Sequence, residues 1–316
     1  MQRGRLASAS FRPQFSGHET FPLRHLWLRK AYDAVKEQFH DGVAPHGVFS
    51  DPDAVARFGV GKNMVRSIRH WALACGVLEE KRFGLAPSAL SEFLFGVEGV
   101  DPFLESPATI WLMHWIVAGR AKRTTTWYWG FNCFSAQNFE REALAEELNE
   151  YCKSLERTRA SESTIKRDVE CFIRSYVPRA GASFTEELTE PLLGELGLVQ
   201  QVGRSTFAFR RGPKPTLPDS VFLFGLLEFW NEFSPVTGSL AFEAIAYEPG
   251  SPGRVFKLDE DSIAERLIAV ERMTRGAVSA SDTAGLRQLV KTKELRYSEL
   301  DVLELGYKKV KLKAAA

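Results

Sequence analysis

The chain has 316 residues, of which 44% are hydrophobic and 26% charged, so it is long enough for roughly two or three compact units with a sizeable core. Its 41 lysines and arginines nearly balance its 40 aspartates and glutamates, and the net charge of +1 excludes a whole-molecule field that would attract nucleic acid. No apolar run approaches the ~20 residues of a membrane span, and residues 1–11 lack the apolar centre of a signal peptide. We therefore expect a cytoplasmic protein without a membrane partner.

The first predicted elements are an arm and a helix. Residues 1–14 show no apolar period and are predicted to form a flexible arm, although their arginines also fit contacts to phosphates or to a minor groove. The signature FSGHETFP at residues 15–22 then opens a helix, with Thr20 as its N-cap and Pro22 in its first turn. An apolar stripe over residues 23–35 continues this helix.

The clearest local pattern lies in residues 51–85. A short helix, a glycine turn at residues 59–61, a second helix that ends near Gly76 and a short hairpin over residues 77–85 follow one another. This is the order of a winged helix-turn-helix, in which the turn glycine permits a left-handed backbone and Val65 packs the second helix onto the first.

The second helix of this unit is predicted to have one apolar and one basic face. Val65, Ile68, Ala72 and Cys75 recur at the spacing of a buried stripe. The same spacing places a basic set on the outside, which suits contacts to phosphates and guanines. A merely solvated face is the alternative, but the adjoining helix-turn-helix pattern favours DNA. The residues predicted to contact DNA are Arg24, Lys62, Asn63, Arg66, Arg69, His70, Lys166, Arg167 and Arg204.

The middle of the chain contains an aromatic block and a second helix-turn-helix-like unit. We interpret the tryptophans and phenylalanines of residues 107–135 as core rather than as a platform for stacked bases, although Arg120, Lys122 and Arg123 interrupt them. The helix predicted over residues 163–176 presents Lys166 and Arg167 outward, and a helix and hairpin follow over residues 192–209.

The last part of the chain predicts a third small module. It comprises a buried helix over residues 221–233, a segment at 240–248 that is either helix or strand, a short strand at 255–258 and a helix over residues 263–273. The prolines of residues 212–218 are typical of a linker before it.

Together these elements predict a mainly α fold with short β wings and multiple winged helix-turn-helix-like modules. The predicted domains are the flexible arm 1–14, an N-terminal winged helix-turn-helix domain 15–100, a helical middle domain 101–218 and a C-terminal α+β or winged module 219–316. A symmetric homodimer is an open alternative to a monomer, because such proteins often bind paired half-sites.

Strong signatures of metal or phosphate chemistry are missing from the sequence. The four cysteines form no CxxC pair and are expected to be reduced packing residues, and there is no paired-histidine zinc motif, glycine-rich phosphate loop or GxSxG elbow. Asp53 with Glu79, Glu80 and Lys81 formally fits a magnesium-binding acid pattern. We favour a structural role for them, because Asp53 is predicted to cap a helix and the other three lie in the hairpin.

The more unusual constellation is His18 with Glu19 at the predicted helix start. An imidazole beside a carboxylate is able to act as a general base or to hold a divalent metal, with Arg24 on a phosphate. The alternative is a structured turn in which both side chains bond to the backbone. His18 and Glu19 are therefore the candidate catalytic and metal-binding residues, with Mg²⁺ or Mn²⁺ as the cofactor if the protein is an enzyme and no cofactor otherwise.

The signature at residues 15–24 resembles the opening of a family of unknown-function proteins linked to bacterial DNA phosphorothioation. Residues 58–65, 163–176 and 254–259 also fit, so the resemblance spans residues 15–307. The best described type in that family is the B component of the Ssp single-strand phosphorothioation and phage-defence system, a DNA nickase. The resemblance implies DNA as the ligand and a cysteine desulfurase, an ATPase and a sulfur-transfer enzyme as partners. It carries no catalytic motif that transfers to particular residues here.

Three functions follow as hypotheses. The first is a metal-dependent DNA nickase that opens one strand for sulfur incorporation. The second is a non-catalytic DNA-binding subunit or transcriptional regulator of the same system. The third is an assembly scaffold whose helix-turn-helix folds bind only protein. DNA affinity that depends on salt separates the first two from the third, and strand cleavage that needs a divalent ion separates the first from the second.

Overall fold

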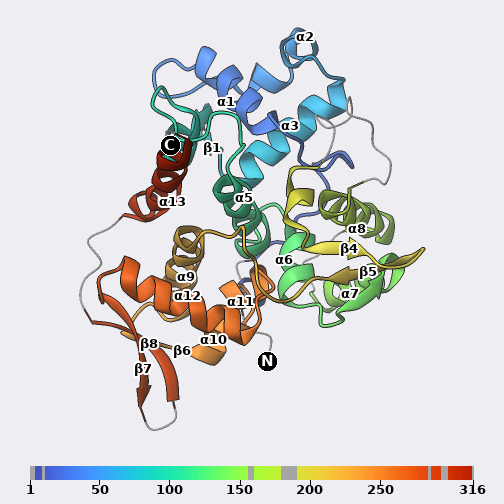
Figure 1. The fold of residues 1–316 in the computed structure, drawn as a ribbon. Coiled ribbons are helices and arrows are strands. Elements are labelled where there is room, and N and C mark those ends of the chain that lie inside the picture. Colours follow the sequence, from blue (N-terminus) through green and yellow to red (C-terminus); the bar gives the residue numbers. More distant parts are fainter. Residues whose placement is uncertain are drawn as a thin grey trace.

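The computed structural model describes residues 4–8, 11–155, 160–178, 191–283, 286–292 and 298–314. Within these residues the chain is mainly helical and carries three small antiparallel sheets (Figure 1), which confirms the predicted mainly α fold with short strands. The helices are α1 (Trp27–Glu37), α2 (Ala54–Phe58), α3 (Lys62–Ala74), α4 (Ala89–Phe95), α5 (Pro107–Gly119), α6 (Thr125–Asn132), α7 (Arg141–Ser154), α8 (Glu162–Tyr176), α9 (Asp219–Phe233), α10 (Phe242–Tyr247), α11 (Pro252–Val255), α12 (Glu260–Met273) and α13 (Glu299–Ala314), with short 3₁₀ helices at Arg5–Ala7, His46–Phe49 and Leu192–Leu196. No helix among them is both long and apolar enough to cross a bilayer.

Each of the three sheets is small and antiparallel. Strands β1 (Leu78–Lys81) and β2 (Gly84–Pro87) form a hairpin directly after α3. The second sheet has the order β3-β5-β4 and the third the order β6-β8-β7. Their strands are β3 (Asn138–Glu140), β4 (Val199–Gln201), β5 (Thr206–Phe209), β6 (Ser239–Ala241), β7 (Val278–Thr283) and β8 (Leu286–Lys291). The β7–β8 hairpin projects from the body beside α10 and α12 (Figure 1).

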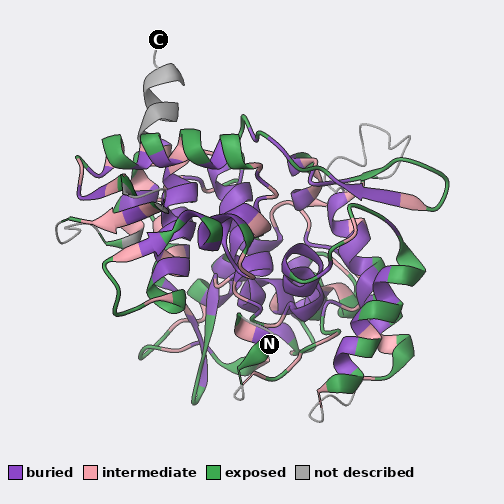
Figure 2. Ribbon diagram, turned by 90° about the horizontal axis from the view of Figure 1, so that it is seen from below, coloured by how far each residue is buried: buried purple, intermediate pink, exposed green. Residues whose placement is uncertain are grey.

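The core is built around α5, which is buried on every side. Each residue from Ala108 to Gly119 is buried, so this helix has no solvent face, and buried residues fill the middle of the fold (Figure 2). A Cβ atom at Gly225 of α9 would lie 2.9 Å from the Trp115 ring, so a glycine allows these two helices to approach closely. The aromatic block is buried as predicted, and one cluster of buried side chains runs from Leu6 to Tyr307. The division into domains stays a prediction.

The N-terminal arm differs from the expected loose segment where the structure describes it. Leu6 is buried, and the Arg5 guanidinium donates to the Arg120 carbonyl at 2.9 Å and pairs with Glu228 at 3.3 Å. The expectation failed because a run of isolated arginines has no local pattern, whereas these contacts join residues more than a hundred positions apart. Arg3, expected in the same arm, lies outside the described residues.

Several local predictions are wrong in ways that tertiary contacts explain. The first long helix begins at Trp27 and not at Thr20, and Asp53 makes no side-chain cap to α2. Residues 255–258 form the end of α11 and a turn with Lys257 at φ +52°, instead of a strand. Within the predicted linker 212–218, Lys214 is only 8% exposed, so this segment packs partly against the body.

Candidate nucleic-acid interface

The signature turn at residues 16–20 has an unusual backbone. Ser16, Gly17, Glu19 and Thr20 all adopt positive φ, with values of 64°, 88°, 48° and 65°. Left-handed backbone is costly for side chains other than glycine, so contacts elsewhere must hold this turn. This explains why the helix starts only at Trp27, because a run of left-handed residues is incompatible with a right-handed helix.

Asp168 of α8 provides those contacts. Its Oδ1 accepts hydrogen bonds from the Ser16 amide and the His18 Nε2, both at 2.6 Å, and its Oδ2 accepts one from the Thr126 hydroxyl. The His18 Nδ1 in turn accepts from the Thr20 amide at 3.0 Å. His18 is only 2% exposed and both of its ring nitrogens are engaged. Its position is therefore that of a side chain that fixes the turn, as in the structural alternative of the sequence analysis.

Gly17 brings the turn against α3. A Cβ atom at Gly17 would lie 2.6 Å from the His70 Nδ1, and its φ of +88° also favours glycine. The His18 ring packs edge-on to His70, with the centroids 5.7 Å apart, and the Trp71 Nε1 donates to the Phe21 carbonyl at 2.9 Å. The turn thus lies on α3 and covers one side of it.

A groove of about 810 Å³ opens where this turn, residues 46–55 and α3 meet. Among the described residues, four cationic side chains and one carboxylate, that of Asp51, line it. These cations are Lys62, Arg66 and Arg69 from α3, and Arg123 from the segment between α5 and α6. Cations concentrated in a groove are the arrangement that a chain of near-zero net charge needs to bind a polyanion.

Two further carboxylates reach the groove cations from its edges. The Glu19 carboxylate lies 3.9 Å from the Arg66 guanidinium. The Glu80 carboxylate of β1 accepts a hydrogen bond from Arg69 at 2.8 Å and another from Arg123 in a closer contact. The charge of the groove is therefore partly compensated within the chain.

The predicted DNA contacts separate into three groups. Lys62, Arg66 and Arg69 lie together in the groove, and Asn63 is exposed beside them on α3. His70 also lines the groove but is 7% exposed, so its placement on the solvated face was wrong. Burial, with help from the charges of His18 and Arg123, lowers its pKa to about 3, so this imidazole is neutral.

The remaining predicted contacts do not line the groove. The Arg24 guanidinium lies over the Phe21 and Trp27 rings, at 5.7 and 5.5 Å from their centroids. On α8, the exposed Lys166 pairs with Glu162 at 2.6 Å and Arg167 is exposed. Arg204 is exposed between β4 and β5. These residues stay predicted contacts.

Arg123 is the groove residue that sequence reasoning missed. It was noticed only as one of three cations that interrupt the aromatic block. The structure brings it to α3, more than fifty residues earlier in the chain, and it lines the groove beside Arg69. Its signal in the sequence was the isolated basic cluster itself, because a cation in an otherwise buried segment requires an exit to solvent or a partner.

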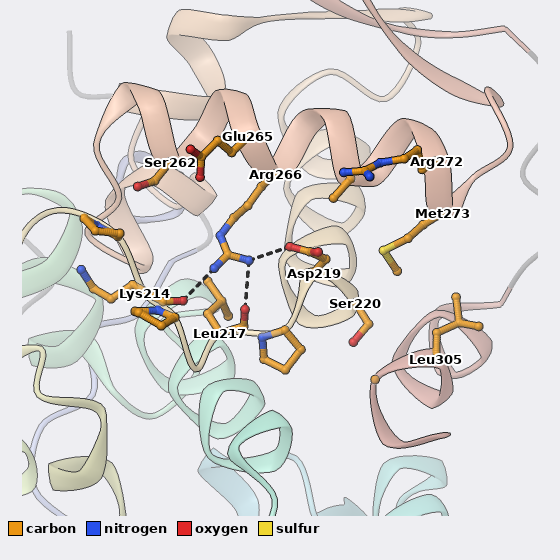
Figure 3. Close-up of a pocket in the computed structure, with 15 residues that line it drawn as sticks. Lys214, Leu217, Asp219, Ser220, Ser262, Glu265, Arg266, Arg272, Met273 and Leu305 are labelled. Atoms are coloured by element: carbon orange, nitrogen blue, oxygen red, sulfur yellow. Dashed lines mark hydrogen bonds and ion pairs between the residues drawn. The ribbon is translucent and has the colours of Figure 1, made fainter. Parts of the chain in front are cut away.

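A larger cavity of about 940 Å³ lies between the start of α9, α12 and α13 (Figure 3). Arg266 donates to the carbonyls of Leu217 and Lys214 and pairs with Asp219 at 2.8 Å. Burial lowers the pKa of Lys214 to about 8, and its Nζ donates to two backbone carbonyls. Because these cations serve the fold, this cavity is a weaker candidate for a polyanion than the groove.

No three histidine, cysteine, aspartate or glutamate side chains converge as a metal site in the part of the chain that the structure describes. The cysteines are free, with Cys133 exposed and the others buried. A divalent ion here would depend on one or two carboxylates, with water or a ligand completing its coordination, which is a common arrangement for Mg²⁺.

The fold and the groove together define a mainly helical protein with a cationic groove on its second and third helices. A family model described as "Protein of unknown function (DUF4007)" matches residues 15–307, and the chain belongs to this family. No curated protein matches the chain in sequence. The chain is similar in structure to a crystal structure of SspB, with 29% identity and a TM-score of 0.81, and to one of magnesium ion-bound SspB, with 28% identity and a TM-score of 0.80. Each comparison covers 94% of this chain and 89% of that one, which confirms the resemblance drawn from residues 15–24.

Proposed function

We propose that the chain is a DNA-binding component of an Ssp-type DNA phosphorothioation system and binds the duplex across the groove of α2 and α3. The observation that carries the proposal is the convergence of Lys62, Arg66, Arg69 and Arg123 on one groove in a chain of net charge +1. The similarity to SspB over nearly the whole chain supports the association with that system. A cysteine desulfurase, an ATPase and a sulfur-transfer enzyme are the partners that this role requires.

In this proposal α2, α3 and the β1–β2 hairpin act as a winged helix-turn-helix. Gly59 between the helices has φ +65°, and Val65 of α3 is buried, as such a unit requires. At the hairpin turn Phe83 is 73% exposed, with the Arg82 guanidinium 5.0 Å from its ring centroid. An exposed aromatic ring beside a cation suits contact with a groove or backbone of DNA.

Replacement of Arg66 and Arg69 together by alanine is expected to weaken binding to a labelled duplex by roughly one to two orders of magnitude, because two phosphate contacts are lost. The slope of log affinity against log salt should also fall by about two. Fluorescence anisotropy over a salt series measures both quantities.

The matched control is Arg141→Ala with Lys153→Ala, which removes two exposed cations from α7. This control should change the affinity only slightly. Equal losses in the two double variants would show that general charge and not the groove determines binding. Wild-type protein that does not bind DNA at low salt would contradict the proposal and favour the scaffold hypothesis.

Nicking is the second candidate function, and the magnesium-bound SspB structure favours it. The groove has Asp51 on its lining, and Glu19 lies beside Arg66 at its edge. Each of these carboxylates is a candidate ligand for Mg²⁺, which often binds to few protein ligands together with phosphate. When bound, the ion would polarise the scissile phosphate. In this proposal Arg66 holds the phosphate, and the Glu19 carboxylate lies 3.9 Å from this guanidinium. His18 has both ring nitrogens engaged and acts as a positioning residue that holds Glu19 in place.

Asp51→Asn is expected to abolish conversion of supercoiled plasmid to open circles in Mg²⁺ or Mn²⁺, a conversion that EDTA should also prevent. Asp53→Asn, in the same loop but not on the groove lining, should nick at the wild-type rate. Bound plasmid that is never nicked by the wild type with either ion would favour the non-catalytic DNA-binding subunit or regulator instead.

A further inference from the structure

The Glu80 carboxylate lies between two guanidinium groups that come from different parts of the chain. Arg69 of α3 donates its Nη2 to Glu80 Oε1 at 2.8 Å, and Arg123 donates its Nη2 to Glu80 Oε2 in a closer contact. Each carboxylate oxygen therefore has its own arginine. Both arginines line the DNA groove, whereas Glu80 belongs to β1 at its edge.

The backbone holds Arg123 firmly in this position. Ala121 and Arg123 adopt φ of +57° and +65°, which is costly for residues other than glycine and persists only where surrounding contacts fix it. One such contact is the Thr124 hydroxyl, which donates to the Val117 carbonyl at 2.7 Å. Since only 25% of the Arg123 side chain is exposed, the guanidinium is directed to one place instead of sampling solvent freely.

His70 also lines the groove, but it adds no charge beside the two arginines. His70 is buried and neutral, with a pKa lowered to about 3 by burial first and then by the charges of His18 and Arg123. Arg69 and Arg123 thus converge on a single pair of oxygens. Two guanidinium groups around two oxygens is also how arginines bind the non-bridging oxygens of a phosphodiester.

We propose that Arg69 and Arg123 are a phosphate-binding pair for the DNA backbone, and that Glu80 occupies it in the free protein until a phosphate displaces it. This inference rests on the proposed DNA binding and adds to it one contact residue, Arg123, and one internal competitor, Glu80. The Glu80 side chain is 42% exposed on a hairpin strand, so it is able to rotate into solvent without disturbing the core. DNA must break these two exposed ion pairs when it binds, and the free energy that this costs lowers the affinity for DNA.

The test compares E80Q with E79Q by anisotropy of a labelled duplex. Both variants remove one negative charge from β1, but Glu79 pairs with Lys81 at 2.6 Å and not with a groove arginine. We expect E80Q to bind roughly three- to tenfold more tightly than the wild type, as expected for the loss of two exposed ion pairs, and E79Q to bind nearly as the wild type does. R123Q should weaken binding and lower the salt slope by about one. In the R123Q background the gain of E80Q over E79Q should be smaller than in the wild type, because only the pair with Arg69 remains to be broken.

The outcomes separate this inference from the proposed function. If the wild type binds DNA and the affinity of E80Q rises no more than that of E79Q, Glu80 does not compete with phosphate, while the proposed DNA binding is still supported. If R123Q binds as the wild type does, Arg123 contacts no phosphate. If neither the wild type nor E80Q binds at low salt, DNA binding itself fails. Chemical unfolding of each variant identifies any loss that comes from the fold, and lysine at position 123 (R123K) should restore part of the affinity in a folded protein.

Discussion

Replacement of Asp168 by alanine is expected to lower the free energy of unfolding by about 3–5 kcal/mol, which is the typical cost of removing one partner from a buried charged network. Asp168 is 2% exposed, and its carboxylate accepts hydrogen bonds from the Ser16 amide, the His18 ring and the Thr126 hydroxyl. Without it, three donors lose their acceptor, and two of them belong to the buried side chains of His18 and Thr126. The left-handed turn at residues 16–20 also loses its main constraint.

Urea unfolding of Asp168→Ala beside Glu170→Ala measures this effect. Glu170 lies on the same helix but is exposed, so its replacement should change the free energy of unfolding by no more than about 0.5 kcal/mol. Asp168→Asn should fall between them, because the amide retains one oxygen acceptor but adds donors that lack acceptors. An Asp168→Ala protein as stable as Glu170→Ala would mean that the signature turn contributes little to the fold.

Local patterns predicted the groove-forming elements well. Alternation of apolar and basic residues at helical spacing placed α3 correctly, because its buried stripe is continuous within one helix. The turn at Gly59 and the hairpin after Gly76 followed from glycines that permit left-handed backbone. The buried aromatic block followed from the size of its side chains alone.

The predictions that failed concern residues whose contacts lie in distant parts of the sequence. His18 looked available for chemistry because Asp168, its acceptor, lies 150 residues away. His70 has the helical spacing of the basic face, but Gly17 covers it. The apolar residues on either side of Lys257 led to the prediction of a strand. In the structure this residue lies in a turn, and its Nζ donates to the Phe131 carbonyl at 2.7 Å. In each case the deciding contact joins distant segments, and a local pattern carries no information about it.

The second large stability effect is expected at Glu228 of α9. Its carboxylate accepts both a two-pronged contact from Arg120, at 2.8 and 2.9 Å, and a hydrogen bond from the Trp115 Nε1 at 3.0 Å, with Arg5 at 3.3 Å. Its side chain is only 16% exposed. Glu228→Ala should therefore cost about 3 kcal/mol, because it leaves partly buried guanidinium groups without their counter-charge. It should also release residues 4–8, which limited proteolysis or amide exchange would detect.

Glu232→Ala is the matched control, one turn along the same helix. Glu232 is 46% exposed and also contacts Arg5, so its loss should cost less than about 1 kcal/mol.

Burial alone would raise the pKa of Glu228, but the charge and hydrogen bond of Arg120, with Trp115 and Arg5, hold this pKa below its ordinary value. A carboxylate whose pKa is lowered in the folded state stabilises the protein at a pH above its unfolded-state pKa. This stabilisation is lost as the pH falls through the folded-state pKa. The wild type should thus lose stability faster than Glu228→Gln on acidification below about pH 4.5, and parallel pH profiles would show that the ionised carboxylate of Glu228 does not stabilise the fold.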